Sequence, residues 1–304
     1  MLQRNKRPLV SIIITTHNRK ELLKKAIVSA TKQTYENIEC IIVDDASTDG
    51  TKEMLDSMSK EYIIRYIRIS SEESRGGNYA RNKGIIAARG TLIAFLDDDD
   101  EWLETKIEKQ VDVLNRNLEI GVVSCGRIRE YNFRKRVFGD VNTIPEGDLS
   151  LRIWEKIPFT TSTILVKKDL LIEVGMFDEK LKFWQEYELL IRLCQVAKVG
   201  VVRENLVVYR IIDKDKKRLT NNINGWMDAV EYIDKKHASL ISDLSEEIKR
   251  KHEIQIACDG LSRSIAVGDK KLQREFLGKI YCLEPTIKNR VKYCLNISKL
   301  KFWN

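Results

Sequence analysis

The first hundred residues alternate between stretches with the pattern of buried strands and stretches with the pattern of helices, which limits the possible folds more than any other feature. The strand-like stretches are rich in Ile, Val and Leu and cover residues 9–14, 38–43, 62–69 and 91–96. The stretches between them have helical spacing of apolar residues or open at glycines, and cover residues 20–33, 51–58 and 77–88. This order predicts an α/β fold, with a mostly parallel sheet and helices on both of its faces.

The rest of the chain is less regular. We expect strands at 120–124 and 161–166 and helices at 103–116, 168–175 and 186–197. Beyond about residue 220 no strand pattern is convincing, and the sequence looks helical. We therefore predict a first domain over residues 1–215 and a helical C-terminal region over residues 216–304.

The composition fits a globular protein with a substantial core, since 43% of the 304 residues are hydrophobic and 32% are charged. There is no apolar run of about 18 residues, so we expect no membrane-spanning helix. A strand pattern rather than an apolar signal core follows the basic N-terminus, and the six cysteines form no CxxC pair. Both features favour a cytoplasmic location.

The net charge of +8 is concentrated late in the chain, in the run at 214–218 and in the segment 286–304. Basic patches attract phosphate groups of nucleotides, nucleic acids or anionic lipids. No nucleic-acid recognition module is visible, so we expect no nucleic-acid partner. The C-terminal segment mixes cations with Leu, Ile, Phe and Trp, and either contacts the inner face of the cell membrane as a peripheral surface or packs as an ordinary helix.

Polar clusters follow three of the predicted strands. They read "TTHNR" after the first strand, "DDASTDG" after the second and "DDDDEW" after the fourth. In open parallel sheets, ligands bind beyond the carboxyl ends of the strands. These clusters therefore predict a ligand site along one edge of the sheet.

The four consecutive aspartates at 97–100 need an explanation, because like charges repel one another. The entrance of the predicted helix at 103 favours acidic residues and accounts for Asp100 and Glu101. Asp97 and Asp98 directly continue an apolar strand, where unpaired carboxylates resist ionisation. A divalent cation offsets this repulsion and takes oxygen ligands, so we predict a site for Mg²⁺ or Mn²⁺.

The motifs taken together resemble the family 2 glycosyltransferases of the GT-A fold. The resemblance covers roughly residues 8–215 and is carried by "VSIIITTHNRKELLKKAIVSATKQTYENIECIIVDDASTDGT" and "FLDDDDEW". It implies a metal-dependent, inverting transfer of a sugar from a nucleotide-sugar donor to an acceptor hydroxyl. A uridine diphosphate donor and a role in bacterial surface polysaccharide biosynthesis are our first expectations.

The resemblance also implies roles for individual residues. The turn after the first strand lines the nucleotide pocket, with Thr15, His17 and Arg19 as its members here. Asp45 accepts a hydrogen bond from the base, which suits a uracil-like imide, and Arg81 approaches the nucleotide or the donor sugar.

Asp97, Asp98 and Asp99 match the DxD motif of the family. By this resemblance Asp97 faces the nucleotide ribose or the metal, Asp98 contacts the nucleotide, and Asp99 binds the metal. Members of the family often carry a histidine after "VVYR", and this chain has none there. Either the basic run at 214–218 contacts the diphosphate in its place, or that contact is absent.

The resemblance places the catalytic base at the Gln185-Glu186 pair that opens the helix at 186–197. We take Glu186 as the base, although the family more often has aspartate. We expect Glu188 and Arg192 to pair on the surface as an i,i+4 pair, and Leu189, Leu193 and Val196 to form the buried face.

The acceptor is poorly encoded, and a glycan or a lipid-linked glycan at the cytoplasmic face fits best. A nucleotidyltransferase is the nearest alternative enzyme, but it would favour a glycine-rich phosphate loop where this chain has "TTHNR". A dinucleotide-dependent oxidoreductase would need a G-x-G-x-x-G motif after the first strand, and this chain has none there. A subunit that binds nucleotide without catalysing a reaction stays open as an alternative that is not an enzyme.

Overall fold

The structure, a computed structural model, describes residues 7–131, 134–137, 141–156, 159–211 and 222–286. They form two compact units. The first holds the described residues up to Leu149, those from 159 to Lys180 and those from Gln185 to 211. The second holds residues 150–156, Leu181–Trp184 and 222–286. In the described part of the chain, no helix combines the length and the apolarity that crossing a membrane requires.

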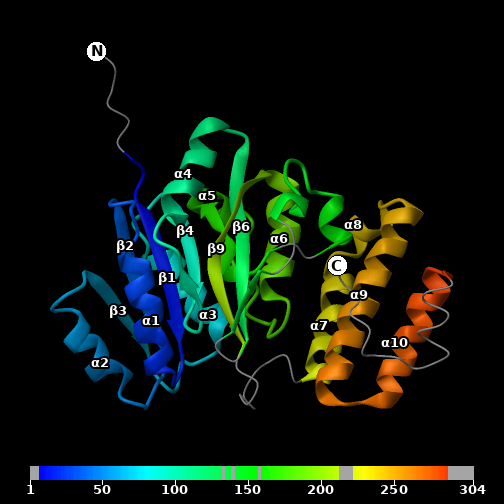
Figure 1. Cartoon of the computed structure of the whole chain (residues 1–304), viewed down its shortest axis with the longest axis horizontal. Helices are drawn as coiled ribbons and strands as arrows, with labels where there is room; N and C mark the ends of the chain where they lie inside the picture. The colour runs from blue at the N-terminus through cyan, green and yellow to red at the C-terminus, as the bar shows by residue number, and fades with distance from the viewer. Residues whose placement is uncertain (1–6, 132–133, 138–140, 157–158, 212–221, 287–304) are drawn as a thin grey trace. The chain divides into compact units, whose positions relative to one another are not determined.

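The N-terminal half of the first unit confirms the predicted alternation (Figure 1). Its strands are β1 (Val10–Thr16), β2 (Ile38–Asp45), β3 (Ile64–Ile69) and β4 (Leu92–Asp97). They pair in parallel in the order β3-β2-β1-β4. The helices between them are α1 (Lys20–Thr31), α2 (Thr51–Met58) and α3 (Gly77–Ala87).

The two faces of β1 explain how the helices pack. Val10, Ile12 and Ile14 point into a core shared with apolar residues of α1, α2 and α4 (Lys106–Arg116). Ile13 points to the other face, against Gly84 of α3. A Cβ atom on Gly84 would lie 2.5 Å from the Ile13 side chain, so glycine permits the close approach of α3 to the sheet.

Beyond β4 the sheet continues with mixed pairing. β8 (Leu165–Lys167) runs antiparallel to β4, and β6 (Ile120–Tyr131) runs antiparallel to β8. β9 (Lys198–Ile211) pairs in parallel with β6 along most of its length. β5 (Glu101–Trp102) and β7 (Arg134–Val137) add short antiparallel pairings to β9 and β6. The strand predicted at 120–124 is thus much longer, and β9 is not among the elements predicted from the sequence.

The remaining elements of the first unit are short or lie near their predicted positions. They are η1 (Val141–Thr143), η3 (Thr161–Thr163), α5 (Lys168–Glu173) and α6 (Gln185–Val196). The strand expected at 161–166 is therefore a 3-10 turn followed by the short β8. The helix expected from residue 103 begins at Lys106 as α4.

The second unit is helical where it is described, as predicted. It contains η2 (Arg152–Trp154), α7 (Ile223–Lys236), α8 (Ala238–Ser242), α9 (Glu246–Val267) and α10 (Lys270–Leu283). Its core includes Trp226, whose ring meets Trp184 and Phe276 edge to face. The functional assignment of residues 216–304 stays a prediction. Of the two basic segments expected to bind phosphates or membrane, 214–218 lies outside the described residues, and so does 286–304 apart from Thr286.

Candidate functional site

The carboxyl ends of β1, β2 and β4 meet at one edge of the sheet, as the polar clusters predicted. Thr15 of β1 lies in register with Val43 of β2 on one side and with Asp97 of β4 on the other. Asp45 ends β2 two residues further on. The loops after these strands therefore form a continuous polar edge.

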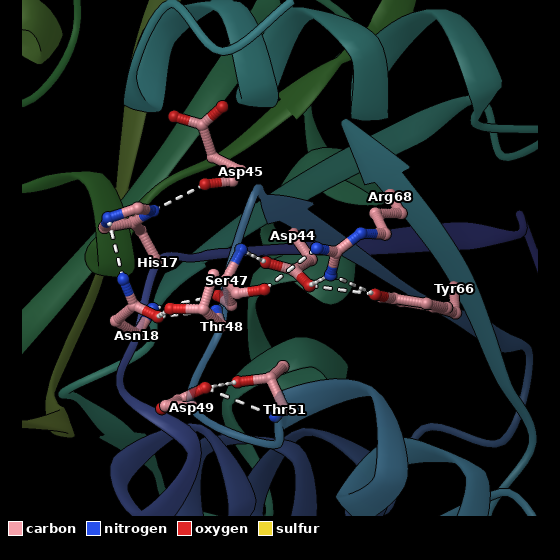
Figure 2. Close-up of polar contacts among 10 residues, drawn as sticks. All are labelled: His17, Asn18, Asp44, Asp45, Ser47, Thr48, Asp49, Thr51, Tyr66 and Arg68. Carbon is pink, nitrogen blue, oxygen red and sulfur yellow. Dashed lines mark hydrogen bonds and ion pairs between the residues drawn. The ribbon is translucent and has the colours of Figure 1, made fainter. Parts of the chain in front are cut away.

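A network around Asp44 fixes the loop after β2 (Figure 2). Asp44 is fully buried, and its carboxylate accepts hydrogen bonds from the Tyr66 hydroxyl at 2.8 Å, Arg68 at 3.1 Å and the Ser47 backbone N–H at 2.9 Å. Arg68 also donates to the Ser47 carbonyl at 2.9 Å. A buried carboxylate needs such partners, and here they come from β3 and from the loop itself.

The loops after β1 and β2 are joined through side chains (Figure 2). The Asn18 backbone N–H donates to the Ser47 hydroxyl at 2.8 Å, and the Asn18 side-chain oxygen accepts from the Thr48 N–H at 2.7 Å. Asn18 adopts a positive φ of 55°, a conformation that asparagine tolerates better than most residues. It therefore connects the two loops, and Arg19 rather than Asn18 precedes α1.

Asp49 serves the N-termini of two helices. Its carboxylate accepts from the Thr51 N–H of α2 at 3.2 Å and from the Lys20 N–H of α1 at 3.0 Å. Burial alone would raise the pKa of Asp49, but these hydrogen bonds and that of the Thr51 hydroxyl outweigh it and lower the pKa. One carboxylate therefore satisfies a free backbone N–H in the first turn of each helix.

Asp45, predicted to read the base, is held at two of its oxygen atoms. Its backbone carbonyl lies 2.5 Å from His17 Nδ1, and its Oδ2 accepts from the Gly76 N–H at 3.0 Å. His17 Nε2 in turn lies 3.0 Å from the Asn18 amide nitrogen, so both contacts are satisfied when Nδ1 carries the proton. Asp45 is 6% exposed, yet its Oδ1 has no hydrogen-bond partner among the described residues.

Arg81 connects the end of β4 to the start of α6. One terminal nitrogen of its guanidinium lies 2.8 Å from Asp97 Oδ1, and the other donates to Gln185 Oε1 at 2.9 Å. The same nitrogen lies 3.3 Å from Asn78, and the group stands over the Phe177 ring. The side chain is nearly buried, so these contacts fix it closely.

Arg19 holds the next two aspartates. It lies 3.2 Å from Asp98 and 3.2 Å from Asp99, while Asp98 also accepts from the Thr16 hydroxyl at 2.8 Å. Burial raises the pKa of Asp98 to about 7, although Arg19 acts in the opposite direction. Asp98 thus faces inward toward the loop after β1, whereas Asp97 and Asp99 are each about a third exposed, at 29%.

Asp100 and Glu101 do not mark a helix entrance, which corrects the expectation from the sequence. Asp100 is buried and accepts from the Arg210 N–H at 3.2 Å, and Glu101 forms an ion pair with the Arg210 guanidinium at 2.6 Å. Glu130 completes the cluster at 2.7 Å. These carboxylates join β5, β6 and β9, and burial followed by the charges of Asp99 and Asp97 raises the pKa of Asp100.

Glu186, the predicted base, lies in the first turn of α6 and is half-buried. Burial raises the pKa of Glu186 and the charge of Asp97 adds to this effect, while Arg81 and Arg127 act in the opposite direction. The fold therefore brings Glu186 within electrostatic range of the aspartate edge, although 89 positions of sequence separate it from Asp97. A carboxyl with a raised pKa in such a setting is typical of general acid–base chemistry.

Two expectations for α6 are wrong. Glu188 is fully buried rather than exposed, and it forms a two-point ion pair with Arg192. Arg192 also donates to the Val174 carbonyl, which joins α6 to the end of α5. Leu189 and Leu193 are buried as predicted, but Val196 is 44% exposed.

Among the described residues, no group of three or more His, Cys, Asp or Glu side chains is placed so that it could hold a metal ion by itself. Asp97 and Asp99, two residues apart and both partly exposed, still suit a cation such as Mg²⁺, which binds one or two carboxylates and completes its shell with water and phosphate oxygens. The donor set therefore fits a cation shared with a phosphate ligand.

The sequence reasoning missed some contributors to the site. Gly76, whose N–H binds Asp45, lies in the loop after β3, and Tyr66 and Arg68, which bind Asp44, lie within β3 itself. The glycine pair at 76–77 indicates the start of α3, and nothing in the sequence marks the Gly76 N–H as a partner of Asp45.

Comparison with known proteins bears on the sequence and on the fold. The profile of the family described as Glycosyl transferase family 2 matches residues 11–176. An uncharacterized glycosyltransferase of Rickettsia typhi is 28% identical over 320 residues, covering 100% of this chain and 98% of the relative. WfaP of Escherichia coli, named as a UDP-Glc:alpha-D-GlcNAc-diphosphoundecaprenol beta-1,3-glucosyltransferase, is 30% identical over 219 residues, covering 71% of this chain and 70% of WfaP.

Two solved structures share the fold. Residues 1–349 of S. aureus TarS match with a TM-score of 0.64 and 17% identity, covering 91% of this chain and 81% of that chain, and TarS has also been solved with UDP-GlcNAc. The mannosyltransferase PcManGT from Pyrobaculum calidifontis, solved with GDP-Man and Mn²⁺, matches with a TM-score of 0.56 and 17% identity, covering 97% of this chain and 85% of that chain. At these identities the likeness concerns the fold, and it confirms the GT-A architecture expected from the sequence.

Proposed function

Because this chain belongs to glycosyl transferase family 2, whose profile matches more than half of its residues, we propose that it transfers a sugar from a uridine diphosphate donor to an acceptor hydroxyl, with inversion. The observation that carries this proposal is the link from Asp97 through Arg81 to Gln185, the neighbour of Glu186. It connects the edge suited to a diphosphate with the helix that carries a candidate base.

The loops after β1 and β2 form the proposed nucleotide pocket. Thr15, His17 and Arg19 line it on one side, and Asp45 offers Oδ1 to the base. The name of WfaP and the TarS complex both concern uridine nucleotides, which supports the same donor class here.

Glu186 is the proposed general base. Its carboxylate takes the proton of the acceptor hydroxyl as the hydroxyl oxygen attacks the anomeric carbon. The bond from that carbon to the diphosphate oxygen breaks on the opposite side, and the nucleoside diphosphate leaves with the bonding electrons. Base assistance of this kind is typically worth about 10²–10⁴-fold in rate.

Asp97 and Asp99 are the residues that would hold a divalent cation, Mn²⁺ or Mg²⁺, with Asp98 positioned behind them against Thr16. When bound, the cation neutralises the negative charge that develops on the leaving diphosphate. The PcManGT complex with Mn²⁺ supports this part of the proposal. Arg81 and Arg19 keep both carboxylates in place through their ion pairs.

For the acceptor we propose a lipid-linked glycan used in bacterial surface polysaccharide assembly. The name of WfaP specifies a diphosphoundecaprenol-linked acceptor, which supports this class. The basic segments that would neutralise diphosphate or approach a membrane surface stay predictions.

The test is a screen of nucleotide sugars with MnCl₂ that measures released nucleoside diphosphate, with and without lipid-linked glycan acceptors. We expect release from one uridine diphosphate sugar, stimulated by an acceptor. Glu186→Gln should still bind UDP but lose transfer, whereas Glu173→Gln, an exposed glutamate on α5, should behave like the wild type. UDP binding without turnover of any donor would instead favour a silent nucleotide-binding subunit.

A further inference from the structure

The two carboxylate oxygens of Asp45 differ in their hydrogen bonding. Oδ2 accepts the Gly76 N–H at 3.0 Å, and the backbone carbonyl of Asp45 is held by His17 at 2.5 Å. Oδ1 has no hydrogen-bond partner among the described residues, although Asp45 is only 6% exposed. Figure 2 shows this carboxylate directed away from the Asp44 network. A buried, unpartnered carboxylate oxygen calls for a donor from outside.

Gly76 can hold Asp45 in this way because of its backbone conformation. Its φ of 92° and ψ of −177° lie in a region that is essentially restricted to glycine. A Cβ atom at this position would meet nothing within 4 Å, so the obstacle to any other residue is backbone strain and not a clash. The direction of the Gly76 N–H is thus set by the residue type.

We propose that Gly76 is a specificity-determining residue: by occupying Oδ2, its N–H makes Asp45 a single-oxygen acceptor that selects a base with one isolated N–H, as in uracil. The inference rests on the proposed function, which assigns the base to Asp45. Guanine presents two adjacent donors, N1–H and the N2 amino group, and pairs best with both oxygens of a carboxylate. The arrangement therefore favours uridine over guanosine nucleotides.

The arrangement also predicts how an amide would behave at this position. In Asp45→Asn the Gly76 N–H still requires an oxygen, so the amide oxygen turns to Gly76 and the NH₂ group faces the base. An NH₂ group repels the N3–H of uracil but donates to N3 of cytosine, which is an acceptor. Asp45→Asn should thus weaken UDP binding by about tenfold or more and reverse the preference toward CDP.

The experiment measures the dissociation constants of UDP, GDP and CDP by titration calorimetry, with and without MnCl₂, on the full chain. Gly76→Ala introduces strain that moves the N–H away from Oδ2, and it should reduce the preference for UDP over GDP. Gly147→Ala is the matched control, because Gly147 also has a positive φ, of 89°, has no atom within 4 Å of its Cβ position and donates its N–H to a carbonyl, that of Val199. It should keep the wild-type preference.

The outcomes separate this inference from the proposed function. If the wild type binds none of the three nucleotides, the proposed function fails. If it prefers UDP but Asp45→Asn shows no gain for CDP relative to UDP, the orientation by Gly76 is wrong. The same conclusion follows if folded Gly76→Ala keeps the UDP-to-GDP ratio of Gly147→Ala. Should Gly76→Ala not fold, the Asp45→Asn result decides alone.

Discussion

Arg81 forms a 2.8 Å ion pair with Asp97 while the other terminal nitrogen of its guanidinium donates to Gln185 at 2.9 Å. This planar group therefore connects the strand that carries the aspartate edge to the helix that carries Glu186. A lysine has the same charge but cannot donate in two fixed, diverging directions from one plane.

We therefore expect Arg81→Lys to lower kcat by up to about 100-fold, because a small misplacement of reacting groups has effects of that size. The measurement is steady-state transfer with the donor identified by the screen. Arg116→Lys, at an exposed position of α4, is the control. Equal rates for the two variants would mean that the two-point contact of Arg81 has no role in catalysis.

The pH dependence of transfer should follow Glu186. Because burial raises the pKa of Glu186, the carboxylate form that accepts a proton becomes populated only above the ordinary range of a glutamate. The rate of the chemical step should therefore rise as pH rises through this raised pKa and then level off. Single-turnover measurements at a series of pH values test it, and a flat profile would remove Glu186 from the role of base.

Stability should depend on pH through Asp98. Its pKa is raised to about 7 by burial, against about 3.9 in an unfolded chain, so the folded state binds the proton more tightly. The stabilisation from this proton is complete below the unfolded pKa and is lost as pH rises toward 7, by at most about 1.4 kcal/mol per unit. Asp98→Asn should thus gain stability relative to the wild type as pH rises in this window.

Urea unfolding at several pH values measures this difference. Asp56→Asn, an exposed position on α2, provides the control for a change of net charge. A constant difference between the wild type and Asp98→Asn would show that Asp98 binds no additional proton in the folded state.

The buried Asp44 should be sensitive to the loss of a donor. Tyr66→Phe removes the 2.8 Å hydrogen bond while leaving Arg68 and the Ser47 N–H in place. We expect a loss of about 1–2 kcal/mol in the free energy of unfolding, since a buried acceptor loses one partner. Thermal and urea unfolding check this, with the partly exposed Tyr62→Phe for comparison. A loss no larger than that of the control would mean that water replaces the Tyr66 hydroxyl.

Metal removal tests the role of the aspartate edge. Treatment with EDTA should abolish donor turnover, and MnCl₂ should restore it in the wild type. Asp99→Asn should require a higher Mn²⁺ concentration, because one of two carboxylate ligands is lost. Full turnover in EDTA would contradict the assignment of Asp97 and Asp99.

The sequence predicted the part of the fold that depends on local patterns. β1, β2 and β4 are short apolar runs followed by polar clusters, so both the strands and the edge they share could be anticipated. β9 was not anticipated, because Arg203, Glu204 and Asn205 interrupt its apolar run, at the point where the structure has a register shift between β6 and β9.

The same distinction holds within the site. Glu188 and Arg192 have the spacing of a surface pair, and spacing on a helix does not reveal how deeply that face is buried. The contact of Arg210 with Glu101 and Glu130 depends on the pairing of β5, β6 and β9, and so it was invisible from the acidic run alone. Backbone donors such as the Gly76 N–H carry no signature of side-chain chemistry at all.

Asp49 accepts hydrogen bonds from the first turns of both α1 and α2, so one carboxylate closes two helix ends. The loops after β1 and β2, which lead into these two helices, are consequently coupled to each other. The Thr51 N–H binds Oδ1 and the Lys20 N–H binds Oδ2 of this one carboxylate, so local opening at either helix also loosens the partner of the other. The two first turns should therefore exchange their amide hydrogens with solvent as one cooperative unit. A variant evolved or engineered for a different ligand would have to remodel both loops together.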